Sequence, residues 1–100
     1  MTAFDHTGLD DIIHGRLRLG VMAYLSSASP ASFLDLKART VATDGNLSAH
    51  LSKLEDAGYV RIEKSFEGKK PVTRVHLTEA GRTAWIAYLD RLKALLSAAE

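Results

Sequence analysis

The stretch from Thr43 to Val60 most constrains what this chain can fold into, because a capped helix, a glycine stop and the start of a strand follow one another within it. At about 100° per residue, Leu47, Leu51 and Leu54 fall on one side of the helix. The opposite side is small and polar, and its residues are Gly45, Asn46, Ala49, Ser52, Lys53 and Asp56. Small residues permit close approach to a grooved partner, and Asn, Ser and Lys can contact base edges and phosphates. The helix alone leaves two interpretations open, a DNA recognition surface and an ordinary solvated face.

The composition predicts one domain. With 100 residues and 46% hydrophobic content, the chain suits one compact domain. It contains no cysteine, which excludes disulfides and zinc fingers built on thiolates. Residues 1–10 lack the basic start and apolar run of a signal peptide, and no stretch approaches the ~20 apolar residues of a membrane span. These features predict a cytoplasmic protein without a membrane partner.

Positive charge is concentrated in the middle of the chain. The formal net charge is only +1, but residues 37–82 carry nine lysines or arginines against six aspartates or glutamates. Residues 1–36 carry two basic residues against four acidic ones. The basic part therefore coincides with the Thr43 helix and the segment that follows it.

Two further helices are expected before Thr43. The first should run over residues 9–26, with Asp10 or Asp11 at its start. Pro30 forces a break. A second, short helix should begin after Ser32, with Asp35 reaching back as in a capping box and with Phe33, Leu34 and Leu36 on its buried side. With the Thr43 helix it forms a helix-turn-helix over residues 32–57.

The hydrophobic period changes to two after Gly58. Residues 59–77 alternate as a β-hairpin whose tip spans Phe66 to Pro71. Thr78 should cap a last helix over residues 78–97, which is longer than a small core requires. The expected fold class is α+β, mainly α: three helices, a hairpin wing and a C-terminal helix available for dimerisation.

This order of elements is the winged helix-turn-helix arrangement. The run from Asn46 to Val60, together with Leu77-Thr78-Glu79-Ala80-Gly81-Arg82, closely resembles the MarR-like bacterial transcriptional regulators, and the match covers about residues 31–82. The resemblance implies a homodimer on a roughly two-fold symmetric DNA site, with recognition helices in successive major grooves and wings on the flanking minor grooves or backbone. It predicts a sequence-specific regulator without a cofactor, more consistent with a repressor, and it leaves a small-molecule effector open.

The resemblance also implies site residues. On the recognition helix, the predicted DNA-binding residues are Asp44, Gly45, Asn46, Ser48, Ala49, His50, Ser52 and Lys53. On the wing they are Lys64, Lys69, Lys70 and Arg74. The family's use of terminal helices for dimerisation points to Ile12, Leu19, Met22, Trp85, Tyr88, Leu89, Leu92, Leu95 and Leu96.

Some residues also allow other interpretations. Trp85 and Tyr88 could line an aromatic ligand pocket, although such a stripe is more often core or dimer seam. The four histidines, His6, His14, His50 and His76, lack ligand spacing, so no metal site is expected. No catalytic constellation stands out, so an enzyme is not expected. The alternative from another class is a winged-helix protein-interaction module, which should expose apolar residues on the helix and wing.

Overall fold

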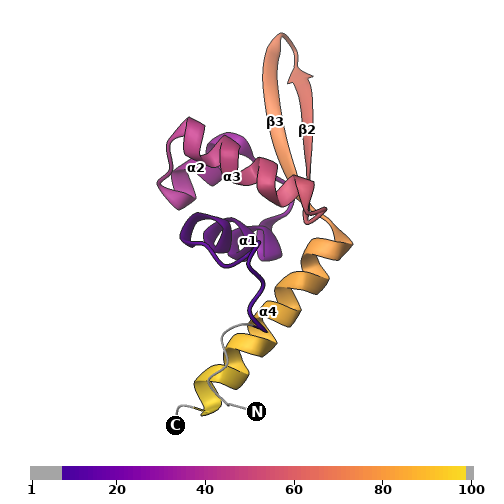
Figure 1. Cartoon of the computed structure of the whole chain (residues 1–100). Helices are drawn as coiled ribbons and strands as arrows, with labels where there is room; N and C mark the ends of the chain where they lie inside the picture. Colours follow the sequence, from indigo (N-terminus) through magenta and orange to yellow (C-terminus); the bar gives the residue numbers. More distant parts are fainter. Residues whose placement is uncertain (1–7, 99–100) are drawn as a thin grey trace.

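The computed structural model describes residues 8–98 as a winged helix with its hairpin and its last helix pointing in opposite directions (Figure 1). The helices are α1 (Arg16–Ala28), α2 (Phe33–Thr40), α3 (Asp44–Asp56) and α4 (Glu79–Ala98). The strands are β1 (Ala31–Ser32), β2 (Val60–Glu67) and β3 (Lys70–Leu77), in the sheet order β1-β3-β2. The predicted fold class is therefore confirmed.

The core lies where α1, α3, α4 and the base of the sheet meet. The leucine stripe of α3, formed by Leu47, Leu51 and Leu54, is buried. Val60 of β2 and Val75 of β3 are buried with it, and other members of the core cluster are Ile13, Val21, Met22, Leu25, Leu36, Trp85 and Tyr88. Burial of a leucine or valine side chain contributes roughly 1.5–3 kcal/mol, so this cluster is the main source of stability.

The predicted start of the first helix is wrong. Residues 10–13 form a separate turn, in which the Asp10 carboxylate accepts from the Ile12 amide at 2.8 Å. Gly15 then adopts an extended conformation (φ −160°, ψ 140°), and α1 begins only at Arg16. The other oxygen of Asp10 accepts a 2.5 Å bond from the Tyr59 hydroxyl. That bond, with burial, raises the pKa of Tyr59 to about 12. Asp10 therefore ties this turn to the base of the wing instead of capping a helix.

The start of α2 is partly as predicted. The Ser32 hydroxyl accepts from the Asp35 amide at 3.0 Å, so Ser32 is the N-cap. Asp35 does not reach back, because its carboxylate accepts from the Tyr24 hydroxyl at 2.5 Å and pairs with Arg39 at 3.5 Å. Leu34 is 67% exposed and is not on the buried side.

Strand β1 is not predicted by the sequence. It consists of two residues, too few for a periodic signal. Ala31 and Ser32 pair with Val75 and Arg74 of β3, and so the N-cap of α2 is held against the sheet. The hairpin itself is longer than predicted, because pairing continues to Glu67 and Lys70 and leaves only Gly68 and Lys69 in the turn. Gly68 has φ +62°, as tight two-residue turns of the Gly-X type require.

The start of α4 is packed against the start of the wing. The Thr78 hydroxyl accepts from the Gly81 amide at 2.9 Å, which confirms Thr78 as the cap. A Cβ at Gly81 would lie far inside van der Waals contact with the Tyr59 carbonyl and close to Leu77. The glycine of the Leu77–Arg82 motif therefore allows a helix to cross a strand at close range.

We predict that Gly81→Ala destabilises the protein by about 1–3 kcal/mol, because a methyl group must push α4 away from Tyr59. Urea unfolding would measure this change in stability. Gly20→Ala is the matched control, since its Cβ would meet only the Thr40 methyl at 3.6 Å. That control should stabilise by up to about 1 kcal/mol through helix propensity. Equal stability of the Gly81→Ala variant and the unsubstituted protein would contradict the close packing.

Candidate nucleic-acid interface

Helix α3 presents its small polar side away from the core. Burial of the leucine stripe sets this orientation, and it leaves Asn46, Ala49, Ser52 and Lys53 exposed. The Thr43 hydroxyl accepts from the Asn46 amide at 3.2 Å, as predicted, and therefore caps the helix. Because Thr43 supplies the cap, the Asn46 side chain is available for another contact.

The side of the wing that packs on the core at the base of the hairpin continues outward beyond α3. Directly opposed residues in an antiparallel pair point to the same side, and every second residue along a strand does so too. The pairs on the core side are Val60 with Leu77, Ile62 with Val75, Lys64 with Thr73, and Phe66 with Pro71. Along this face, the side chains change from buried and aliphatic at the base to exposed at the tip.

A groove of about 400 Å³ separates α3 from the wing. The helix contributes Asp44, Ser48, Leu51 and Ser52, and the wing contributes Ile62, Lys64 and Thr73, with Phe33 from α2 at one end. The floor is therefore apolar, whereas hydroxyls, the ammonium group of Lys64 and the carboxylate of Asp44 line the walls. The structure brings Lys64 and two exposed residues of α3, Ser48 and Ser52, to one groove.

The cations of the wing fall into two groups. Lys64, Lys69 and Lys70 are exposed and have no ion pair among the residues that the structure describes. Arg74, on the opposite side of the hairpin from Lys64, forms an ion pair with Glu67. The predicted wing set is therefore divided, because the three lysines keep their positive charge free and Arg74 is paired within the wing.

Two residues predicted on the recognition helix have partners inside the domain. Asp44 forms an ion pair with Lys37 at 2.8 Å, which joins the start of α3 to the end of α2. His50 is half-buried and faces α1, where the Arg18 guanidinium donates to its Nδ1 at 2.8 Å. Burial, followed by the charges of Arg18 and Lys53, lowers the pKa of His50. Gly45 and Ser48 are exposed and have no such partner in the described part of the chain.

A wider groove of about 940 Å³ lies between α1 and the connection from α2 to α3. Its lining includes Arg16, Tyr24, Arg39, Asn46 and His50. The Arg39 guanidinium lies 5.4 Å from the centre of the Tyr24 ring and also pairs with Asp35. Tyr24 and Arg39 are therefore engaged with each other along the rim of this groove.

The predicted dimerisation residues divide into buried and exposed ones. Met22, Trp85 and Tyr88 are buried in the core of the chain, so their prediction as contact residues is corrected. Leu19, Leu92 and Leu95 are partly buried, and Ile12 is at the limit of exposure. Leu89 and Leu96 of α4 are 42% and 61% exposed, together with Ile86 at 53%. The exposed apolar surface of α4 is thus narrower than the sequence predicted.

Trp85 and Tyr88 pack against each other. Their rings are stacked with centroids 5.9 Å apart, and the Tyr88 hydroxyl lies 2.8 Å from Nδ1 of His14. Neither groove described above is lined by these rings. His76 lies 3.4 Å from Glu63 on the wing, and His6 is outside the described residues. Within residues 8–98, no three histidine, aspartate or glutamate side chains are grouped as metal ligands.

Thr73 and Phe66 lie on the side of the wing that borders the groove with α3, although neither is among the residues predicted from the sequence. The signal for Phe66 lies in the alternation of β2, where this residue follows Val60, Ile62 and Lys64 at every second position. When residues 66–71 are assigned to the turn, the sequence predicts no face for Phe66, because side chains in a turn do not alternate between two faces.

The chain matches the family model of the winged helix DNA-binding domain over residues 17–96, and it belongs to that family. Over 78 residues it is 35% identical to an uncharacterized protein of Methanocaldococcus jannaschii, covering 78% of this chain and 85% of that protein. The fold is similar to a transcriptional regulator homologue of Pyrococcus horikoshii, with a TM-score of 0.84 and 30% identity over 89% of this chain and 88% of that one.

Two further solved structures share the fold at lower identity. A MarR-family transcriptional regulator from Silicibacter pomeroyi has a TM-score of 0.68 at 23% identity, with 86% of this chain matching 57% of that one. NadR in complex with 4-hydroxyphenylacetate has a TM-score of 0.67 at 20% identity, with coverage of 89% and 65%. The predicted MarR-like fold is confirmed.

The family match and the neighbours support a DNA-binding regulator. The family and fold are those of transcriptional regulators, which are not enzymes. None of the helices within residues 8–98 is long and apolar enough to cross a membrane.

We predict that Lys69→Gln/Lys70→Gln weakens binding to all duplex DNA sequences alike, because free ammonium groups contact phosphates without reading bases. The slope of log affinity against log salt should fall by about 0.9 for each phosphate contact that the substitutions remove. Fluorescence anisotropy at several salt concentrations would measure both effects. Lys93→Gln, at an exposed lysine of α4, is the control and should change neither. An unchanged slope in the double variant would contradict a role for the wing lysines.

Proposed function

We propose that the chain is a sequence-specific transcriptional regulator that binds DNA as a homodimer, with α3 in the major groove and the wing on the flanking backbone or minor groove. The observation that carries the proposal is the groove between α3 and the wing, where Ser48 and Ser52 face Lys64 and Thr73. One face thus combines small polar side chains on a helix with free cations on a hairpin, which suits base reading and phosphate contact respectively.

Asn46 is the residue of α3 best suited to reading a base. It is exposed in the first turn, and asparagine can form a bidentate pair with adenine. Ser52 and Lys53 lie further along the same side and suit phosphate or base contacts. Ala49 lies between them, and its small side chain lets the helix approach the floor of the DNA major groove closely. The exposed side of α3 contains no large apolar residue, which favours DNA over the alternative of a protein-interaction module, whereas the wing does expose one, Phe66.

The dimer proposal is supported by the exposed side of α4. Leu89 and Leu96 lie within about 20° of each other on the helical wheel, and Ile86 lies about 60° from Leu89. Their exposure creates an apolar strip on a helix that extends away from the wing (Figure 1). Pairing of two such strips would bury apolar surface in a two-fold symmetric dimer, the symmetry that a palindromic DNA site requires.

Repression is the simpler mode of action for such a dimer. It needs only occupancy of a promoter, whereas activation needs a surface that contacts the transcription machinery. We therefore propose a repressor that acts in the cytoplasm.

We predict that selection from random duplexes with the full chain enriches a symmetric site with half-site centres about 34–36 Å apart, one helical turn. Asn46→Ala should bind that site more weakly by about 1–3 kcal/mol and show no preference at one position of each half-site, because one base contact is removed. Sequencing of the selected pools and anisotropy on single duplexes would measure both.

Thr83→Ala, an exposed polar position on α4, is the matched control for Asn46→Ala and should leave the selected site unchanged. If Asn46→Ala weakened binding to random DNA as much as binding to the selected site, Asn46 would have no role in reading bases. If the unsubstituted chain enriched no sequence, the proposed specific regulator would be wrong.

We also predict that Leu89→Glu/Leu96→Glu converts the protein to a monomer, because two charges would be placed in the apolar strip of α4. Sedimentation velocity at micromolar concentration would measure the change, and circular dichroism would verify that the helices persist. Leu34→Glu is the control, since it removes a leucine of similar exposure on α2 and should leave the dimer intact. A monomeric unsubstituted protein at that concentration would contradict dimerisation through α4.

A further inference from the structure

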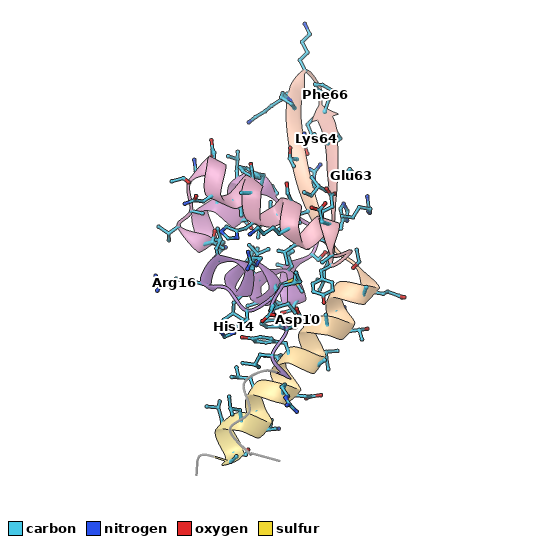
Figure 2. All side chains as sticks on the ribbon, viewed as in Figure 1. Asp10, His14, Arg16, Glu63, Lys64 and Phe66 are labelled. Carbon is cyan, nitrogen blue, oxygen red and sulfur yellow. The ribbon has the colours of Figure 1, made fainter. Side chains whose placement is uncertain are left out.

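The tip of the wing carries an exposed aromatic side chain that phosphate contact does not explain. Phe66 is 72% exposed, the most exposed aromatic residue among the large hydrophobic residues of the described chain. It lies near the far end of the hairpin, beyond Lys64 (Figure 2). Exposure of a phenylalanine to water is unfavourable, and Phe66 is opposite a second exposed apolar ring, that of Pro71, so the wing ends in an exposed apolar pair.

By strand register, Phe66 lies on the side of the wing that borders the groove with α3. It is opposite Pro71, and this pair follows the Lys64–Thr73 pair on the face that borders the groove with α3. At ~3.3 Å per residue, Phe66 lies about 13 Å further along β2 than Ile62 at the groove floor. An object seated on α3 would therefore meet Phe66 and Pro71 at its edge.

The apolar pair is surrounded by positive charge. Lys64 precedes it on the same face, Lys69 follows in the turn, and Lys70 lies next to Pro71 on the other face. All three are without ion pairs among the described residues. The acidic Glu67 beside them is neutralised by Arg74. A second copy of this tip would be repelled by these lysines, whereas a polyanion is attracted. Charge complementarity thus selects nucleic acid as the occupant.

The dimensions require the minor groove to open. Opposed side chains in a hairpin have Cβ atoms ~5 Å apart, so the pair is about 9 Å across with its van der Waals radii, against about 6 Å for the minor groove of undistorted DNA. Phenylalanine and proline are among the apolar residues that proteins insert between base steps to unstack them and bend the duplex. A flat ring and a rigid pyrrolidine ring can enter a base step without leaving a polar group unpaired.

We propose that the Phe66–Pro71 pair is a minor-groove wedge, which unstacks a base step beside the major-groove site and bends the DNA. The inference rests on the proposed DNA-binding function and adds to it a specific role for the wing tip. Because pyrimidine–purine steps unstack most easily, the wedge would favour such a step at a position that α3 does not contact. Phe66 would therefore be a specificity-determining residue that acts through the deformability of DNA.

The test measures how far the bound protein bends a DNA duplex that carries the selected site. The duplex has about 30 base pairs, which is three helical turns. Fluorescence energy transfer between dyes on its ends measures the bend at saturating protein, and 2-aminopurine placed at successive flanking positions reports unstacking. We expect the unsubstituted chain to increase both energy transfer and 2-aminopurine fluorescence at one step in each flank. Phe66→Ala should abolish both signals and weaken binding about tenfold, the scale on which one aromatic stacking interaction contributes.

Two variants separate a wedge from a general weakening of affinity. Phe66→Leu, which keeps an apolar wedge, should retain most of the bend. Lys69→Gln/Lys70→Gln should need more protein to saturate the duplex but bend it equally at saturation. Binding by the unsubstituted chain without any change in energy transfer, or an unchanged bend with Phe66→Ala, would overturn the wedge and leave the proposed function standing. Failure of the unsubstituted chain to bind DNA at all would overturn the proposed function itself.

Discussion

Burial of Leu47, Leu51 and Leu54 is the interaction on which the rest of this structure depends. These leucines fix the rotation of α3 about its axis, because any other rotation would expose them to water at a cost of several kcal/mol. The same rotation turns Asn46 and Ser52 outward. The helix therefore needs no contact on its outer side to hold that side in place, and its small polar residues remain available for a partner.

Strand register has the same effect in the wing. Val60 and Val75 are held in the core, and the alternation of an antiparallel pair then determines which side every later residue faces. Lys64 reaches the groove beside α3 for this reason, and Arg74 falls on the other side with Glu67 as its partner. A slip of one residue would exchange these roles. The position of the Lys64 charge is thus a consequence of hydrophobic packing at the base of the hairpin.

Much of this arrangement could be predicted from the sequence, because its signals are local. The caps at Thr43 and Thr78 and the change of period after Gly58 depend on a few neighbouring residues, and each is found in the structure. Long-range partners could not be predicted in the same way. Asp10 is separated by 49 residues from Tyr59, and this bond replaces the expected helix cap. Nothing near Arg74 in the sequence distinguishes it from the lysines whose charge remains free.

One face, made by α3 and the wing, is proposed to contact DNA, and the roles assigned above to Asn46, the wing lysines and Phe66 depend on it. Amide chemical shifts of the labelled protein, recorded while duplex DNA is added, test this most directly because they report on nearly every residue at once. We predict the largest changes over residues 43–53 and 64–73, with small changes over the distal half of α4. Changes centred on α4 around Leu89 and Leu96, with none on α3, would contradict it.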